Sequence, residues 1–162
     1  MKIALISDTH SKPLPKGLVR ALYGVELILH AGDISSIKTL DELSDFAPVI
    51  SARGNEDLEI SDPRVKDNVF LEISGFKIGV SHDLPLPELP PWRTFERLME
   101  DRFGTRVDIY IYGDTHTESI SLYKDTLLVN PGSLTLPHNF EKPGTLGIME
   151  IKERVFLRII QL

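Results

Sequence analysis

Short apolar runs alternate with segments of helical spacing through the first third of the chain. Three of these runs predict buried strands, each followed by polar residues: 2–7, 26–30 and 48–52. Helices are expected over 17–23 and 36–46, because apolar side chains there recur on one face. This part of the chain is therefore predicted to form a βαβα unit with parallel strands.

The rest of the chain carries the signals of hairpins. Strands are predicted in three pairs joined by short turns: 69–73 with 76–81, 119–123 with 126–129, and 145–151 with 155–160. A single strand is expected over 107–112, and a proline-rich loop leads into a helix over 92–103. The length of 162 residues fits one domain, residues 1–162. The predicted fold is α/β, a four-layer αββα sandwich of two mixed β-sheets flanked by helices.

The composition narrows the class of protein. With 41% hydrophobic and 26% charged residues, it is that of an ordinary globular chain. A formal net charge of -6 weighs against a general nucleic-acid-binding surface, which relies on lysine and arginine. The absence of cysteine excludes disulfides and thiolate metal sites. The first apolar run is too short for a signal-peptide core or a membrane span, so we expect a cytoplasmic protein with no membrane partner.

Polar side chains follow five of the predicted strands at the point where each strand ends. They are Asp8 and His10, Asp33, Asn55, His82, and Asp114 and His116. In open α/β sheets, ligands bind beyond the carboxyl ends of the strands. Taken singly, each cluster is explained as well by the turn and cap preferences of Asp and Asn, or by a structural histidine. Five such ends in one small chain favour a metal site, and its oxygen and nitrogen ligands suit Mn, Fe, Zn or Mg.

The order of these motifs resembles that of a known family. Asp8-Thr9-His10, Gly32-Asp33, Gly54-Asn55, His82 and residues 113–116 match in order the D-x-H, G-D, G-N, H and G-H-x-H pattern of the calcineurin-like metallophosphoesterase superfamily. The small size and Asn130-Pro131-Gly132-Ser133 are similar to its prokaryotic branch of YfcE-like phosphodiesterases. The resemblance covers nearly the whole chain.

By this resemblance the protein is a hydrolase with two divalent metal ions, with Mn favoured and Mg, Fe, Zn or Ni also compatible. The first ion would take Asp8, His10, His116 and a bridging Asp33. The second would take Asp33, Asn55, His82 and Asp114. A hydroxide bridging both ions would attack the phosphorus of a small phosphodiester or phosphomonoester. Side chains expected to help hold the phosphoryl oxygens are Asn55, His82 and Arg53.

Two positions depart from the family pattern. Asp114 stands where the family has histidine, and its anionic oxygen favours Mn or Mg over Zn or Ni. Glu56 stands where many members carry a histidine that resembles a general acid. Glu56 is a candidate for that catalytic role, although two nearby cations would lower its pKa. A leaving group of low pKa would need no acid, and His138 is the other candidate, although a loop histidine is more often simply exposed.

Two other functions stay open. The retromer subunit of this fold resembles the enzymes but binds partner proteins, and Asp114 and Glu56 are compatible with such a scaffold. All seven ligand positions nevertheless hold side chains able to bind metal, which favours the enzyme. A nuclease of the same superfamily is disfavoured by the net charge and by the lack of a lysine and arginine stripe. The exposed edge strands of two sheets also allow a homodimer.

Overall fold

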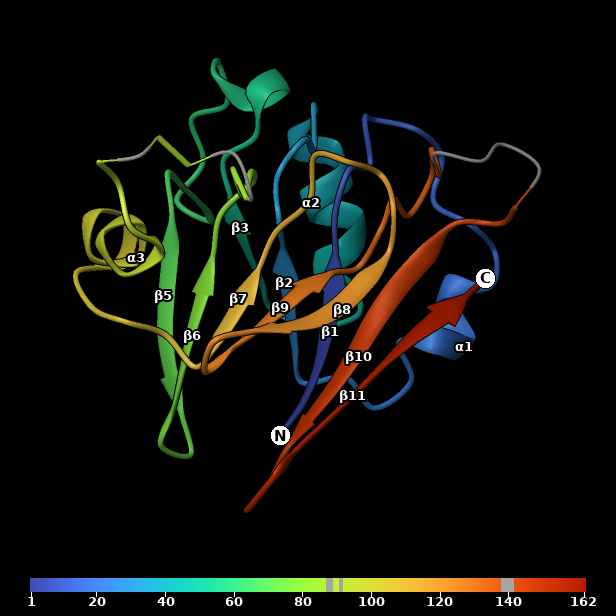
Figure 1. The fold of residues 1–162 in the computed structure, drawn as a ribbon. Helices are drawn as coiled ribbons and strands as arrows, with labels where there is room; N and C mark the ends of the chain where they lie inside the picture. Colours follow the sequence, from blue (N-terminus) through green and yellow to red (C-terminus); the bar gives the residue numbers. More distant parts are fainter. Residues whose placement is uncertain (87–88, 91, 138–141) are drawn as a thin grey trace.

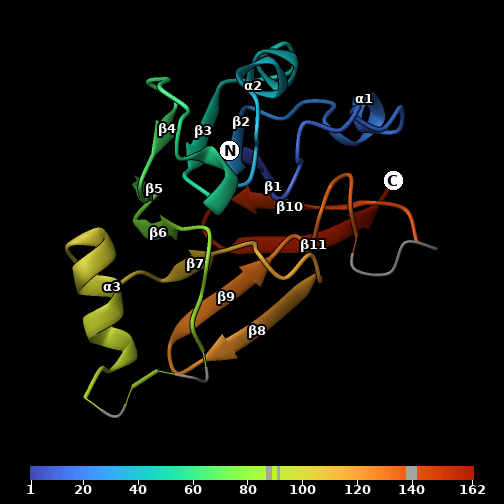
Figure 2. The same ribbon diagram turned by 90° about the horizontal axis from the view of Figure 1, so that it is seen from above.

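Two β-sheets pack face to face in the computed structural model, which describes residues 1–86, 89–90, 92–137 and 142–162 (Figure 1 and Figure 2). The first sheet contains, in order, β11 (Val155–Gln161), β10 (Thr145–Ile151), β1 (Lys2–Ile6), β2 (Leu27–His30), β3 (Val49–Ala52) and β4 (Val65–Lys66). The second contains β5 (Val69–Ile73), β6 (Phe76–Val80), β7 (Ile109–Ile111), β9 (Thr126–Asn130) and β8 (Ser119–Tyr123).

Both sheets are mixed. Strands β1 to β4 run parallel, and β10 and β11 are added to them antiparallel. In the second sheet β6, β7 and β9 run parallel, while β5 and β8 pair antiparallel at its two edges. The parallel strands of both sheets therefore bring their carboxyl ends to the same side of the molecule, where ligands bind in folds of this kind.

Helices cover the outer faces of the sandwich. Apolar side chains of α1 (Leu18–Ala21) and α2 (Ile37–Ser44) pack on the first sheet in one buried cluster with Ile28 and Ile148. Helix α3 (Phe95–Phe103) packs on the second sheet against Tyr110 and Leu128. A third cluster, which includes Ile3 and Ile78, fills the space between the sheets. These layers confirm the predicted αββα sandwich.

The differences from the predicted elements have local causes. Helix α3 begins at Phe95 rather than at residue 92, because the Thr94 hydroxyl accepts the Arg97 N–H and caps the helix there. Helix α1 keeps only four of the seven predicted residues. Strand β4 was not predicted, since two residues are too few to show a period. The second sheet was expected to be built of hairpins, but β7 pairs parallel on both sides.

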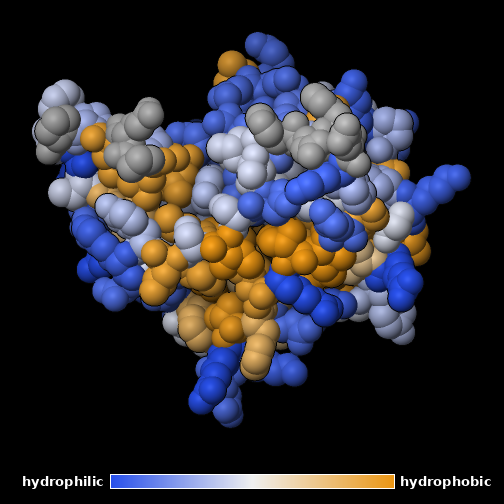
Figure 3. All heavy atoms as spheres, turned by 45° about the vertical axis from the view of Figure 1, so that its right-hand side comes forward, coloured by the Kyte–Doolittle hydropathy of each residue, from blue (hydrophilic) through white to orange (hydrophobic). Residues whose placement is uncertain are grey.

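Apolar side chains lie along the open edge of the sandwich formed by β8 and β11. Ile120 and Leu122 of β8 are exposed, as is Phe156 of β11, and Figure 3 shows hydrophobic side chains gathered on the side of the molecule that carries these strands. The homodimer expected from exposed edges stays a prediction.

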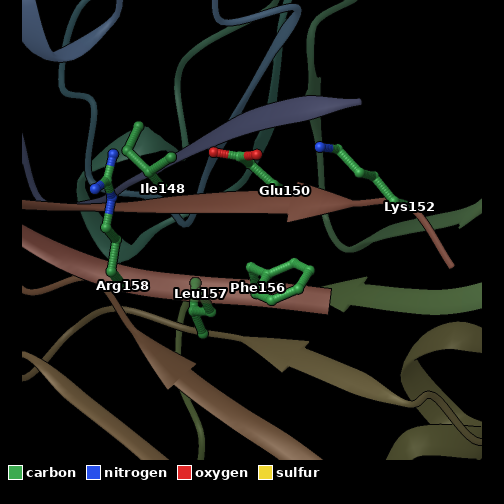
Figure 4. Close-up of a pocket in the computed structure, with 6 residues that line it drawn as sticks. All are labelled: Ile148, Glu150, Lys152, Phe156, Leu157 and Arg158. Atoms are coloured by element: carbon green, nitrogen blue, oxygen red, sulfur yellow. The ribbon is translucent and has the colours of Figure 1, made fainter. Parts of the chain in front are cut away.

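A hollow of about 470 Å³ lies on β10 and β11 (Figure 4). Its lining includes Glu150, Phe156 and Arg158 and none of the predicted site residues.

No helix in the described part of the chain has both the length and the apolar character that a membrane span requires.

Candidate metal centre

The predicted site residues gather where five strands end. Asp8 and His10 follow β1, Asp33 follows β2, and Asn55 opens the short 3-10 helix η1 (Asn55–Asp57) after β3. From the second sheet, His82 follows β6, and Asp114 and His116 follow β7. All these loops leave the carboxyl ends of parallel strands, on the upper side of the molecule in Figure 1. Both sheets therefore contribute to one site.

Five of these residues have a left-handed backbone that side chains other than glycine seldom adopt. Their positive φ values are 53° at Asp8, 46° at His10, 56° at Asp33, 68° at Asp114 and 55° at His116. Asp and His tolerate this region better than most residues, but it remains uncommon. Strained backbone of this kind clusters at functional sites, where the surrounding structure holds it in place.

Close backbone approach explains two of the glycines that precede candidate ligands. A Cβ at Gly32 would lie 2.7 Å from His82 Nδ1 and 2.9 Å from the Gly54 backbone. A Cβ at Gly54 would overlap the backbone nitrogen and the carboxylate of Asp33. Gly32 also has a φ of +89°. Larger side chains at either position would force apart the loops that follow β2 and β3.

Three imidazoles direct one nitrogen each toward the same space. The Nδ1–H of His116 donates to the Leu136 carbonyl at 2.7 Å, and the Nδ1–H of His82 donates to the Ala31 carbonyl at 2.7 Å. A carbonyl can only accept, so both rings carry a proton on Nδ1, which leaves Nε2 as the nitrogen able to bind a cation. The third imidazole, His10, has Nδ1 at 2.9 Å from Glu56 Oε2 and Nε2 at 3.0 Å from His116 Nε2.

Carboxylate oxygens complete the cluster, and two of its buried polar atoms have no hydrogen-bond partner among the described residues. Asp8 Oδ1 lies 3.5 Å from His116 Nε2, and Asp33 Oδ2 lies 3.4 Å from His82 Nε2. In the part of the chain that the structure describes, Asp8 Oδ1 and His82 Nε2 are the two atoms in question. A buried polar atom without a partner is costly, and cations bound in this cluster would satisfy both atoms. The donors present therefore fit divalent metal ions.

The geometry groups the candidate ligands into three overlapping sets. Within each set, one ligand atom of each residue lies within 4.8 Å of the others. The sets are Asp8, His10 and His116; Asp8, Asp33 and His82; and His10, Asp33 and Glu56. Asp8, His10 and Asp33 each belong to two sets. The role of Asp33 as the ligand shared by two cations stays a prediction.

The charges of the cluster are strongly interdependent. Burial alone would lower the pKa of His82, but the adjacent Asp33 carboxylate and the bond to Ala31 raise it to about 9. Burial raises the pKa of the Asp8 carboxyl, opposed by the Ser7 hydroxyl. Burial also acts to raise the pKa of Asp33, but His82 and the Glu56 N–H outweigh it and lower that pKa. A proton on His82 thus supplies positive charge that a metal ion would otherwise supply.

The remaining predicted residues lie at the rim. Asp114 Oδ1 lies 3.6 Å from His82 Nε2, and its side chain is half exposed. Asn55 is exposed at the start of η1. Arg53 donates to the carbonyls of Asp57 and Ile60 and to the Asp67 carboxylate, so its guanidinium supports the η1 loop. Its contact with phosphate stays a prediction, as does any role of His138, which lies outside the described residues.

The contacts of Glu56 differ from those of a general acid. Its carboxylate accepts the Ser35 hydroxyl at 2.5 Å and lies 2.9 Å from His10 Nδ1. The Ser35 hydroxyl, followed by His10, lowers the pKa of Glu56. An ionised carboxylate cannot protonate a leaving group, so the structure argues against the catalytic role considered for Glu56.

Three residues behind the cluster join its loops, and the sequence patterns gave them no role. The Asp57 carboxylate accepts the backbone N–H groups of Ile34, Ser35 and Gly54. Arg102 of α3 binds both carboxylate oxygens of Asp83, the residue after His82. The Ser133 hydroxyl donates to the Asp8 carbonyl. Two of these residues lie within stretches that the sequence analysis singled out: Asp57 in Gly-Asn-Glu-Asp and Ser133 in Asn-Pro-Gly-Ser.

His30 is also buried, like His82, but it does not belong to the predicted ligand set. Its Nδ1 accepts the Gly32 N–H and its Nε2 lies 3.2 Å from the Thr9 hydroxyl, so it joins the loops that follow β1 and β2. Complete burial, with a further contribution from His82, lowers its pKa to about 3. His30 is therefore neutral in the folded protein at every pH above about 3.

Acidification should destabilise the protein through His30. Its folded pKa of about 3 is below the ordinary value of 6.5, so the unfolded chain binds the proton first as the pH falls. The contribution of neutral His30 to the free energy of unfolding is complete above pH 6.5. It falls by about 1.4 kcal/mol per pH unit between pH 6.5 and pH 3. Between pH 6.5 and 5, the unfolding free energy of the wild type should fall by about 2 kcal/mol more than that of His30→Gln, measured by urea unfolding. Equal losses would contradict a neutral His30.

Known proteins resemble this chain over most of its length. The family model described as the calcineurin-like phosphoesterase superfamily domain matches residues 1–154. A probable metallophosphoesterase of Methanocaldococcus jannaschii is 41% identical over 142 residues, which are 85% of this chain and 70% of that protein. A probable metallophosphoesterase of Methanothermobacter thermautotrophicus is 36% identical over 141 residues, which are 85% of this chain and 79% of that protein.

Solved structures share the fold at lower identity. Vps29 from Entamoeba histolytica, solved in complex with zinc, superimposes with a TM-score of 0.72 and 22% identity over 99% of both chains. A structure described as a novel archaeal phosphodiesterase superimposes with a TM-score of 0.69 and 23% identity over 100% of both chains. The family match and the 41% identical relative go further than the shared fold. The chain belongs to the calcineurin-like phosphoesterase superfamily, as the order of its motifs predicts.

Proposed function

We propose that this protein is a metal-dependent phosphodiesterase that uses two divalent cations. The observation that carries the proposal is the convergence of three imidazole Nε2 atoms on two buried carboxylates. One of these carboxylates has an oxygen without a hydrogen bond to any described residue. The first cation would be held by Asp8, His10, His116 and Asp33. The second would be held by Asp33, Asn55, His82 and Asp114. Oxygen and nitrogen ligands of this kind suit Mn, and also Mg, Fe, Zn or Ni.

Cations held in this way would supply an activated nucleophile at neutral pH and offset negative charge on the phosphoryl oxygens. The protein's own groups hold the ligands in place: Asp33 lies between the two half-sites, and its Oδ1 is fixed by the Glu56 N–H at 2.9 Å. The exposed Asn55 amide is able to donate to a phosphoryl oxygen from outside the cluster. Because Glu56 is a poor acid, esters with leaving groups of low pKa should be cleaved fastest.

Hydrolysis assays test the proposal directly. Chelator-stripped protein should be assayed on bis-p-nitrophenyl phosphate and p-nitrophenyl phosphate, with Mn, Mg, Zn and Ni each added back. Metal-dependent cleavage of the diester, faster than that of the monoester, supports a phosphodiesterase. A preference for the monoester would assign a phosphomonoesterase, and plasmid degradation under the same conditions would assign a nuclease. Lack of cleavage with every metal, by protein that binds the metals, would reject the enzyme.

A protein-binding scaffold is the second candidate. It is favoured by the structural likeness to Vps29 and by Asp114, which departs from the family's histidine. A scaffold does not need strained ligands, whereas five of the candidate ligands here have a positive φ. The enzyme is therefore the better supported of the two. Metal binding without hydrolysis of any phosphoester would favour the scaffold.

Replacing Asp114 tests its place in the second half-site. Asp114→His should shift the preference of the site toward Zn and Ni by roughly tenfold relative to Mn, because an imidazole replaces a hard carboxylate oxygen. Competition titrations with pairs of metals measure this ratio without relying on activity. Asp125→His, which changes an exposed aspartate in the β8–β9 turn, is the matched control. An unchanged ratio in Asp114→His would remove Asp114 from the ligand set.

A further inference from the structure

The Nδ1 atom of each of the three imidazoles lies next to a hydrogen-bond acceptor, but the acceptors differ in kind. His82 and His116 donate to backbone carbonyls, whose positions are fixed by the fold. His10 instead has its Nδ1 2.9 Å from a side-chain carboxylate, that of Glu56. Its other nitrogen faces His116 Nε2 at 3.0 Å and Asp8 Oδ1 at 3.9 Å. His10 therefore lies between the Glu56 carboxylate and the candidate metal site.

Contacts to two neighbouring loops hold Glu56 in this position. The Ser35 hydroxyl donates to the same Oε2 atom that faces His10. The Glu56 backbone N–H donates to Asp33 Oδ1 at 2.9 Å. Glu56 thus contacts one ligand of each predicted half-site, with His10 bound through the side chain and Asp33 through the backbone. Its side chain is 53% exposed, so its loss leaves no large cavity.

We propose that Glu56 is a positioning residue: its carboxylate holds His10 with the proton on Nδ1 and the Nε2 lone pair directed at the cation bound by Asp8, His10 and His116. A carboxylate behind a ligating histidine fixes the orientation of the ring and increases its basicity as a ligand. The inference rests on the proposed function, because it requires a cation at this half-site. It gives Glu56 a role in metal affinity rather than in protonation of the leaving group.

Titration of chelator-stripped protein with Zn by calorimetry, without substrate, tests this role. Glu56→Ala should weaken one of the two binding steps roughly 10- to 100-fold, the usual effect of losing such an outer partner. Glu56→Gln keeps an oxygen that accepts from Nδ1–H and should recover most of the affinity. Glu59→Ala removes an exposed glutamate three residues away and should bind Zn like the wild type. Nitrogen NMR of the Zn-loaded wild type should find the His10 proton on Nδ1.

The outcomes separate the alternatives. Unchanged Zn affinity in Glu56→Ala, with a selective loss of activity on esters of high leaving-group pKa, would overturn the inference and restore Glu56 as a general acid. Equal losses in the Ala and Gln variants, together with a lower unfolding free energy of the metal-free protein, would also overturn it, since they indicate a purely structural role. A wild type that binds no cation would reject the proposed function itself.

Discussion

Asp33→Asn is expected to abolish most hydrolysis and to weaken the binding of both cations. Asp33 is shared by two of the three ligand sets, and its Oδ2 lies 3.4 Å from His82 Nε2 and 4.0 Å from His10 Nε2. The substitution removes one negative charge from the point where both half-sites meet. Since cations in such a pair contribute several kcal/mol to the stabilisation of the transition state, kcat/KM should fall roughly 100- to 1,000-fold.

The fold should survive this substitution, because the Asn amide oxygen is still able to accept the Glu56 N–H that Asp33 Oδ1 accepts. The measurement pairs kcat/KM on bis-p-nitrophenyl phosphate in Mn with the number of cations bound per chain. Asp45→Asn, an exposed carboxylate at the end of α2, is the control and should match the wild type in both. Full activity and two bound cations in Asp33→Asn would reject a shared ligand at this position.

The sequence predicts the architecture because each sheet is built from apolar runs that stop at polar residues. Strand β2 is fully buried and reads as one apolar run, so its end before Asp33 is visible in the sequence. The parallel pairing of β7 with β6 and β9 is not visible, since it depends on contacts between residues far apart in the chain. The two-residue β4 is too short to carry any period.

The candidate ligands were predictable from their positions, whereas the groups that hold them were not. His10 and Asp33 follow strands, where a ligand is expected. His30 lies at the end of an apolar run, and only the structure reveals that it joins Thr9 to Gly32. The link from Glu56 to His10 spans 46 positions, and a side-chain contact of that separation has no local signature.

Asp57→Ala is expected to destabilise the protein more than any other single change in these loops. The Asp57 side chain is fully buried, and its oxygens accept three backbone N–H groups at 2.8 to 2.9 Å, from Ile34, Ser35 and Gly54. A buried donor left without a partner costs about 1 to 3 kcal/mol, and water admitted to the vacated space would satisfy part of the deficit. The unfolding free energy should therefore fall by about 3 to 5 kcal/mol.

Graded substitution distinguishes these hydrogen bonds from general packing. Asp57→Asn keeps one oxygen for the Ile34 and Ser35 N–H groups but turns an NH₂ toward the Gly54 N–H. Its free energy of unfolding should therefore fall by about half as much as that of the alanine variant. Asp45→Ala, at an exposed carboxylate, should lose less than about 0.5 kcal/mol. Urea unfolding in the presence of chelator measures all three without a contribution from metal binding. If Asp57→Ala unfolded at the same urea concentration as Asp45→Ala, the Asp57 carboxylate would have no part in holding the loops after β2 and β3 together.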